Sequence, residues 1–256
     1  MIDLAERWKN RAARAKELEG RCPAAKELLH FYGEVLRFQA QLAETTRQRA
    51  DTGIPLTQQI DLTIAAAALP TLLRIAQKYG PATLTQAAQQ LESDGETRWT
   101  DVLASPASEL EIFFARACLQ PLAEHLQVQY PVSTDEAARL CPACGSLPQV
   151  IILRPEGEGA RRSLLCSLCL REWAFRRVLC PFCGETDKEN LPYYTASECT
   201  HVRVEACDTC LHYLKSVDLS LDGLAEPLVD EVALGALDLW AFDHGYQKIA
   251  NNLIGL

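Results

Sequence analysis

Eight of the eleven cysteines in this chain stand in pairs whose members are separated by two residues. The four Cys-x-x-Cys pairs are Cys141/Cys144, Cys166/Cys169, Cys180/Cys183 and Cys207/Cys210. Two thiolates on one tight turn can bind the same ion, and a second such turn completes the four sulfur ligands that zinc or iron takes in a tetrahedral site. The spacing therefore predicts two tetrathiolate metal sites, with these eight cysteines as the ligands.

The cysteine pairs form an internal repeat. Cys141-Pro-Ala-Cys-Gly returns 39 residues later as Cys180-Pro-Phe-Cys-Gly, and a second pair follows after 21 residues in the first copy and 23 in the second. Gly145 and Gly184 come directly after a cysteine, where a tight turn favours a residue that adopts positive φ easily. We predict that the first pair shares an ion with the second pair, and the third with the fourth. Sharing between alternate pairs also gives four ligands to each ion and stays open.

Cys22, Cys118 and Cys199 lie outside the repeat. Cys118 stands among apolar residues and is expected to be buried, while the sequence assigns no role to Cys22. Cys199 and His201 lie between the third and fourth pairs, so either is an alternative ligand, although each site already has four. Zinc and iron both accept four thiolates, so the pattern alone leaves the metal and its redox activity open.

Two other functions use paired cysteines. A thioredoxin-like redox protein needs one such pair in a βαβ unit, whereas this chain has four pairs and no such pattern. A zinc-ribbon nucleic-acid binder needs a clustered positive surface, but the net charge is −9, and residues 141–217 carry nine basic and nine acidic side chains. Both functions remain alternatives. We find no catalytic triad and no phosphate-binding glycine loop, so we expect no enzyme activity, no catalytic or organic-cofactor residues and no nucleic-acid partner.

The predicted secondary structure changes near residue 140, from helices before it to short strands after it. Apolar residues at helical spacing, such as Leu29, Tyr32 and Leu36, predict a helical domain over residues 1–139. Within it Ser108 is expected to cap a helix, and Pro70 is expected to end or kink another.

Helical spacing disappears after residue 140. Short apolar segments predict strands at residues 150–153, 173–178, 202–204 and 213–217. Residues 140–178 and 179–219 are the two predicted rubredoxin-like or zinc-ribbon units. Residues 220–256 are predicted to form a C-terminal helix with a mostly acidic outer face that packs on the rest of the protein, against the N-terminal helices. The predicted fold class is therefore α+β.

A basic cluster interrupts the otherwise neutral central section: Arg161, Arg162, Arg171, Arg176 and Arg177. The last three can offset the negative charge of metal-bound thiolates, and the alternative is a docking patch for an acidic partner. Trp173 and Phe175 alternate along a predicted strand, and we expect them to fill the core rather than stack on bases.

The chain has no sign of membrane insertion. Its longest uninterrupted apolar segment, residues 64–69, is too short to cross a bilayer, and residues 1–20 lack the apolar region of a secretory signal. We therefore expect a cytoplasmic protein, in which thiols stay reduced and bind metal. The oligomeric state stays open, a homodimer included.

Five segments form a pattern beyond the cysteine spacing: Cys141-Pro-x-Cys-Gly, Leu-Cys-Ser-Leu-Cys-Leu-Arg-Glu-Trp at 165–173, Cys180-Pro-Phe-Cys-Gly, Ala-Cys-Asp-Thr-Cys-Leu-His-Tyr-Leu-Lys at 206–215, and the acidic segment 230–246. This pattern resembles the formate dehydrogenase accessory protein family, FdhE. The resemblance is strong over residues 140–246 and weaker over the helical first half, where the chain is expected to be shorter than other members. All four cysteine pairs of the family are present.

The resemblance implies a bacterial cytoplasmic chaperone or assembly factor needed for active respiratory formate dehydrogenase, a molybdenum enzyme that is exported folded by the twin-arginine route. It implies that the partner is the catalytic subunit of that enzyme, bound before export. It also implies that the cysteine pairs act as rubredoxin-like turns that bind iron, which favours iron over zinc for both ions, with a proposed redox role.

Overall fold

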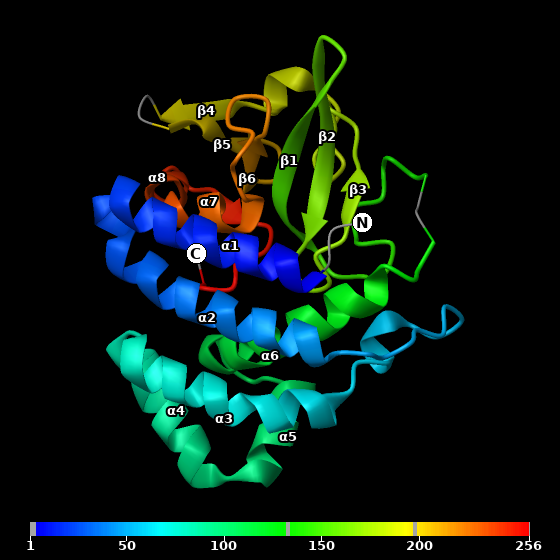
Figure 1. Ribbon diagram of the computed structural model, residues 1–256. Helices are drawn as coiled ribbons and strands as arrows, with labels where there is room; N and C mark the ends of the chain where they lie inside the picture. The colour runs from blue at the N-terminus through cyan, green and yellow to red at the C-terminus, as the bar shows by residue number, and fades with distance from the viewer. Residues whose placement is uncertain (1–3, 132–133, 197–198, 256) are drawn as a thin grey trace. The chain divides into compact units, whose positions relative to one another are not determined.

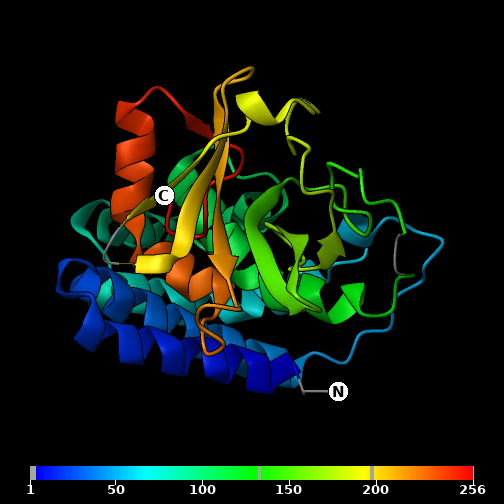
Figure 2. The ribbon, with the colours of Figure 1, turned by 90° about the horizontal axis from the view of Figure 1, so that it is seen from above.

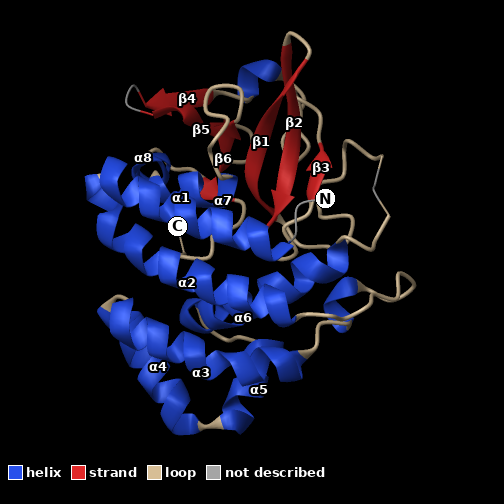
Figure 3. Ribbon diagram, viewed as in Figure 1, coloured by secondary structure: helices blue, strands red, loops and turns tan. Residues whose placement is uncertain are grey.

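The structure is a computed structural model that describes residues 4–131, 134–196 and 199–255. It divides into two compact units, one made of the described residues up to Tyr130 with Leu253–Gly255, the other of Pro131–Asn252. The first unit is built from helices, whereas the second contains the sheet (Figure 3). The predicted α+β class is confirmed.

The first unit contains the helices α1 (Leu4–Arg21), α2 (Lys26–Thr45), α3 (Leu62–Tyr79), α4 (Ala82–Asp94), α5 (Glu96–Ala104) and α6 (Glu109–Gln127). Two single 3-10 turns, Pro23–Ala25 and Leu56–Gln58, lie in its connections. Helices α1 and α2 lie side by side in Figure 1, and α6 packs on α2, α3 and α5. None of the described helices combines the length and the apolar character needed to span a bilayer.

The helical pattern read from the sequence matches the first unit. Leu29, Tyr32 and Leu36 are buried on α2, as predicted from their spacing. The Ser108 hydroxyl accepts a hydrogen bond from the Glu111 N–H at 3.2 Å, which confirms the predicted cap of α6. Helix α3 continues through Pro70. The expectation that the helix ends at this proline is therefore wrong. A proline removes one backbone hydrogen bond, and the buried apolar face of α3 outweighs that loss.

The second unit is organised by a seven-stranded sheet. Its strands are β1 (Pro148–Glu156), β2 (Gly159–Cys166), β3 (Glu172–Ala174), β4 (Tyr193–Ala196), β5 (Cys199–Cys207), β6 (His212–Asp218) and β7 (Gln247–Lys248). The order is β3-β2-β1-β6-β5-β4, and β7 pairs with β6. A 3-10 turn at Lys188–Asn190 precedes β4.

A parallel pairing of β1 with β6 joins the two cysteine repeats. The pairing runs from Val150 opposite Lys215 to Leu153 opposite Asp218. Figure 2 shows the green β1–β2 hairpin of the first repeat beside the orange β6 of the second. Every other pair within the two repeats is antiparallel between neighbours along the chain. The two repeats therefore share one sheet, which fixes both cysteine groups to a common framework.

The predicted C-terminal helix is present as two short helices, α7 (Pro227–Ala233) and α8 (Gly235–Asp243), separated at Leu234. Helix α7 packs on β6 and β1 within the second unit. The prediction that the acids of this segment face solvent is wrong for Asp230, Glu231 and Asp238, which are buried. Packing of this segment on the N-terminal helices stays a prediction.

Buried lysines explain why these acids lie inside the protein. Lys215 of β6 and Lys248 of β7 both form ion pairs with Glu231 and Asp238. The Tyr213 hydroxyl also donates to Asp238 at 2.7 Å. Two cations and two anions thus balance one another, which makes burial of the charges tolerable.

Candidate metal centres

The first repeat brings its four cysteine sulfurs together. The Sγ atoms of Cys141, Cys144, Cys166 and Cys169 all lie within 4.8 Å of one another. The Cys141–Cys169 distance is 3.5 Å and the Cys144–Cys166 distance is 3.3 Å. Four ligands at about 2.3 Å from a tetrahedral ion lie about 3.8 Å apart, so this group is slightly contracted but has the shape of such a site.

The second repeat forms a matching group from Cys180, Cys183, Cys207 and Cys210. Its Sγ atoms are 3.8 Å apart between Cys180 and Cys210 and 3.7 Å apart between Cys183 and Cys207. These distances agree with the tetrahedral spacing of about 3.8 Å. The first Cys-x-x-Cys pair therefore lies with the second, and the third pair lies with the fourth. Pairs that alternate along the chain do not share a group.

Strands and backbone hydrogen bonds fix these cysteine turns. Cys166 ends β2 and Cys207 ends β5, so the sheet positions one turn of each group. The other turn closes on itself: the Gly145 N–H donates to the Cys141 carbonyl at 2.8 Å, and the Gly184 N–H donates to the Cys180 carbonyl at 3.1 Å.

All four turns place a residue with positive φ directly after their second cysteine. Gly145 and Gly184 have φ of 75° and 86°, as their identity predicted. Leu170 and Leu211 take the same place in the other two turns, with φ of 54° and 57°. A leucine here is strained, which is why the sequence did not reveal these two positions. The cysteine turns therefore adopt the same backbone conformation even at the two positions where a leucine disfavours positive φ.

Backbone N–H groups point at one sulfur of each group. The amides of Leu168 and Cys169 lie 3.3 and 3.4 Å from Cys166 Sγ, and those of Phe182 and Cys183 lie 3.4 and 3.5 Å from Cys180 Sγ. Such donors stabilise a thiolate. The arrangement suits sulfur that carries charge, as metal-bound sulfur does.

The sulfurs of the first group also shift one another's pKa. Hydrogen bonds from Cys141 and its neighbours lower the pKa of the Cys144 thiol, and the same contacts raise the pKa of the Cys169 thiol. Although its contact with Cys144 opposes the shift, hydrogen bonds with Cys166 and Cys169 lower the pKa of the Cys141 thiol as well. The four thiols therefore differ in how readily they ionise. Four thiolates together require a bound cation, and the residues present fit one.

The two groups differ in exposure. Cys141, Cys166 and Cys169 are buried in the first group, whereas Cys183 is exposed in the second. Leu211, beside Cys210, is 51% exposed. The second group is therefore the more accessible to solvent and to other molecules.

A hydrogen bond between side chains connects the two turns of the second group, and the sequence did not reveal it. The Thr209 hydroxyl donates to the Glu185 carboxylate at 2.6 Å. This contact, with the N–H groups of Asp187 and Thr186, lowers the pKa of Glu185 to about 2. The carboxylate is therefore ionised and tightly held at neutral pH.

Among the described residues, no other candidate belongs to either four-cysteine group. Cys118 is buried in α6, and burial raises the pKa of its thiol, as expected for an apolar site. Cys22 is half-buried between α1 and α2. His201 Nε2 donates to the Asp230 carboxylate at 2.9 Å, and His201 lies with Asp222 and Asp230. The side chain of Cys199 lies outside the described part of the structure.

The aromatic residues and arginines of the basic cluster have different environments. Trp173 and Phe175 are buried, which confirms their predicted place in the core. Arg171 is buried and donates to the Pro131 carbonyl at 2.9 Å. Arg162 is also buried, whereas Arg177 is exposed.

Comparisons with known proteins match the same segments. Residues 140–177 match the FdhE central domain and residues 178–254 match the FdhE C-terminal domain. The chain is similar to the FdhE homologue of Aquifex aeolicus, with 31% identity over 192 residues that cover 72% of this chain and 68% of that protein. An FdhE homologue of Pseudomonas aeruginosa is 37% identical over 130 residues, which cover 48% of this chain and 41% of that protein.

The fold is similar as well. The crystal structure of the FdhE protein from Pseudomonas aeruginosa superimposes with a TM-score of 0.78, at 25% identity, over 98% of this chain and 96% of that one. With the two matched domains and the Aquifex aeolicus relative, this likeness shows that the chain belongs to the FdhE family.

Proposed function

We propose that this protein is a cytoplasmic assembly factor for formate dehydrogenase that binds the catalytic subunit and is not itself an enzyme. In this proposal the eight paired cysteines hold two metal ions, and iron is favoured. The observation that carries the proposal is the pair of four-sulfur groups on one sheet in a chain of the FdhE family.

The coordination number supports a structural rather than a catalytic role. Four cysteines complete a tetrahedral site and leave no position for a substrate or water, unlike catalytic zinc sites with three protein ligands. The turns that carry the cysteines connect the strands, so a bound ion would tie the two ends of each repeat to the sheet. Iron in the second group would also supply one-electron redox chemistry, and the exposed Cys183 gives that group access to a redox partner.

A surface on α8 supports binding of a protein partner. Leu239 is 64% exposed and Phe242 is 75% exposed, and they lie three residues apart, which places them on one face of the helix. Trp240 between them packs on Tyr194 with ring centroids 4.6 Å apart, which holds α8 in place. Neighbouring exposed apolar side chains of this size are typical of interaction sites.

The test is genetic and biochemical. Deletion of the gene is expected to abolish formate dehydrogenase activity while the catalytic polypeptide is still made, and the wild-type chain should restore it. The double variant L239S/F242S should fail to restore activity and should no longer co-purify with the catalytic subunit. Ile54→Ser, which changes a 42% exposed apolar residue of the first unit, is the matched control. Full activity in the deletion strain would contradict the proposal.

A further inference from the structure

A cavity beside the second cysteine group is lined by arginines from three chain segments. Its volume is about 140 Å³. Arg162 comes from β2, Arg177 follows β3, and Arg203 comes from β5. Glu205 of β5 lies with them. We call this feature, defined by these four residues, the arginine cavity.

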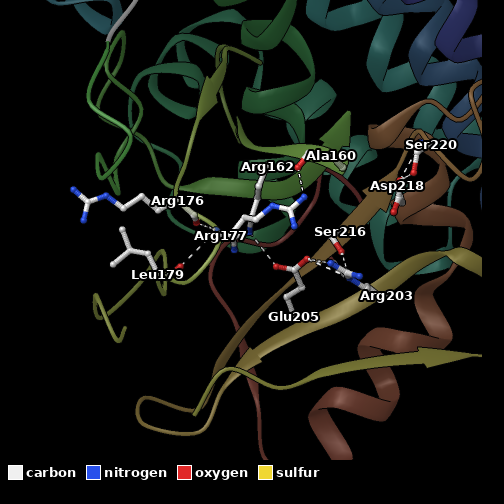
Figure 4. Close-up of polar contacts among 10 residues, drawn as sticks. All are labelled: Ala160, Arg162, Arg176, Arg177, Leu179, Arg203, Glu205, Ser216, Asp218 and Ser220. Carbon is white, nitrogen blue, oxygen red and sulfur yellow. Dashed lines mark hydrogen bonds and ion pairs between the residues drawn. The ribbon is translucent and has the colours of Figure 1, made fainter. Parts of the chain in front are cut away.

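Figure 4 shows how the charged groups of the arginine cavity meet. Arg162 Nε donates to Glu205 Oε2 at 3.1 Å, and Arg203 Nη2 donates to Glu205 Oε1 at 3.0 Å, so two guanidinium groups share one carboxylate. The Arg177 guanidinium lies nearby and donates to the Ala160 carbonyl. Arg176, the adjacent residue in the chain, extends its side chain in the opposite direction (Figure 4).

The charge in the arginine cavity is unbalanced. Guanidinium groups keep their charge at any physiological pH, so three arginines face one glutamate and leave an excess of two positive charges. The Arg162 side chain is only 6% exposed, and an unbalanced charge is costly at such a buried position. The cavity therefore favours an anion over neutral contents.

Several N–H donors around the cavity have no protein acceptor among the described residues. Arg162 uses Nε and Nη1, the latter on the Arg176 carbonyl at 2.8 Å, but its Nη2 has no partner within the described residues. Over the same part of the chain, Arg203 Nη1 and the Nε and Nη1 of Arg177 have none either. Donors on three arginines are thus available to a ligand, and Arg177 is the exposed residue among the three.

A competing explanation is that the arginines only balance the metal-bound thiolates, because Cys180 and Cys207 share a wall of the cavity. Charge balance across a wall leaves the unused N–H donors to water, whereas an oxyanion in the cavity supplies both the charge and the acceptors. We propose that the arginine cavity is a binding site for a small oxyanion, either a planar carboxylate or a tetrahedral phosphate-like ion.

Calorimetric titration of the metal-loaded full chain at about 0.15 M ionic strength, where the Debye length is about 8 Å, tests the site, with inorganic phosphate and acetate as the two probes. We expect saturable one-to-one binding of at least one probe, and the preferred probe tells whether the site takes a tetrahedral or a planar ion. Arg177→Gln should weaken that binding about tenfold or more, since it removes a charged donor.

Arg176→Gln is the matched control. It makes the same charge change one residue away, and the Arg176 side chain points away from the arginine cavity (Figure 4). It should keep the affinity within about twofold, because a charge outside the site is screened by salt. Circular dichroism and metal content establish that both variants are folded and loaded. Absence of saturable binding of both probes would overturn the proposal, as would equal weakening by the two substitutions.

Discussion

Thr209 and Glu185 join the two cysteine turns of the second metal group through a hydrogen bond of 2.6 Å. Glu185 directly follows the turn that carries Cys180 and Cys183, and Thr209 lies between Cys207 and Cys210. The Glu185 carboxylate also accepts the N–H groups of its own turn, so it cannot move away without breaking several contacts. The second group, although exposed, is thus held closed by a contact outside its sulfur ligands.

The first prediction concerns the release of metal. We expect a chelator to remove metal in two phases, with the faster phase from the second group because Cys183 is exposed. Thr209→Val should accelerate only that phase, by about two- to tenfold, since it removes one hydrogen bond. Thr186→Val is the control, because this threonine is exposed and its hydroxyl makes no hydrogen bond among the described residues. Equal acceleration by both variants would contradict the assigned role of Thr209.

The second prediction concerns the two strained leucines. Leu170 is 4% exposed and Leu211 is 51% exposed, although their φ angles are nearly equal. Leu211→Gly should leave the free energy of unfolding unchanged or raise it by up to about 1 kcal/mol, because relief of strain exceeds the loss of an exposed side chain. Leu170→Gly should lower it by about 2–5 kcal/mol, because it empties a buried position. Denaturant unfolding of the metal-loaded protein measures both, and a large loss in Leu211→Gly would argue against strain at this turn.

The metal groups and the helical first unit could be predicted because their signals are local. The repeat of Cys141 and Cys180 sets which sulfurs can meet, and the spacing of Leu29, Tyr32 and Leu36 sets one face of α2. Such patterns depend on a few neighbouring residues. They hold without knowledge of the rest of the fold.

Contacts between distant segments could not be predicted. Strand β2 begins Gly-Ala-Arg-Arg, which has no strand pattern, and it forms because it pairs with β1 and β3. The parallel pairing of β1 with β6 joins residues 65 positions apart, such as Val150 and Lys215. Glu231 and Asp238 look like surface acids until Lys215 and Lys248 are known to meet them.

The third prediction tests the buried ion cluster. Lys215→Met should lower the free energy of unfolding by about 3–5 kcal/mol, because Glu231 and Asp238 then share one cation in a buried site. Lys188→Met is the control, since that lysine side chain is 80% exposed and its removal should change stability by at most about 0.5 kcal/mol. Equal effects of the two substitutions in denaturant unfolding would show that the cluster contributes nothing specific.

The fourth prediction is a dependence on acid. Burial alone would raise the pKa of Asp238, but the charges of Lys215 and Lys248 bring it below its ordinary value. A lowered pKa in the folded state means that this stabilisation is complete above the pKa of an unfolded aspartate, about 3.9, and is lost as pH falls through the folded-state value.

Asp238→Asn should therefore flatten the fall in unfolding free energy below about pH 4. The exposed Asp243→Asn should keep the wild-type slope, because that carboxylate has no buried cation beside it among the described residues. Acid protonates the cysteine thiolates equally in both variants. The difference between their slopes of unfolding free energy against pH therefore reports the contribution of the buried Asp238 carboxylate. Identical slopes would rule out the assigned shift.

Elemental analysis of the full chain, purified without oxygen and combined with an absorption spectrum, tests the central claim most directly. The account predicts two metal ions per chain, about one after the four cysteines of the second group are changed to serine, and loss of the sheet's cooperative unfolding after complete chelation. Iron should give a coloured ferric tetrathiolate and zinc a colourless protein. A chain that contains no metal when its thiols are reduced, and that keeps its fold and stability in chelator, would contradict it.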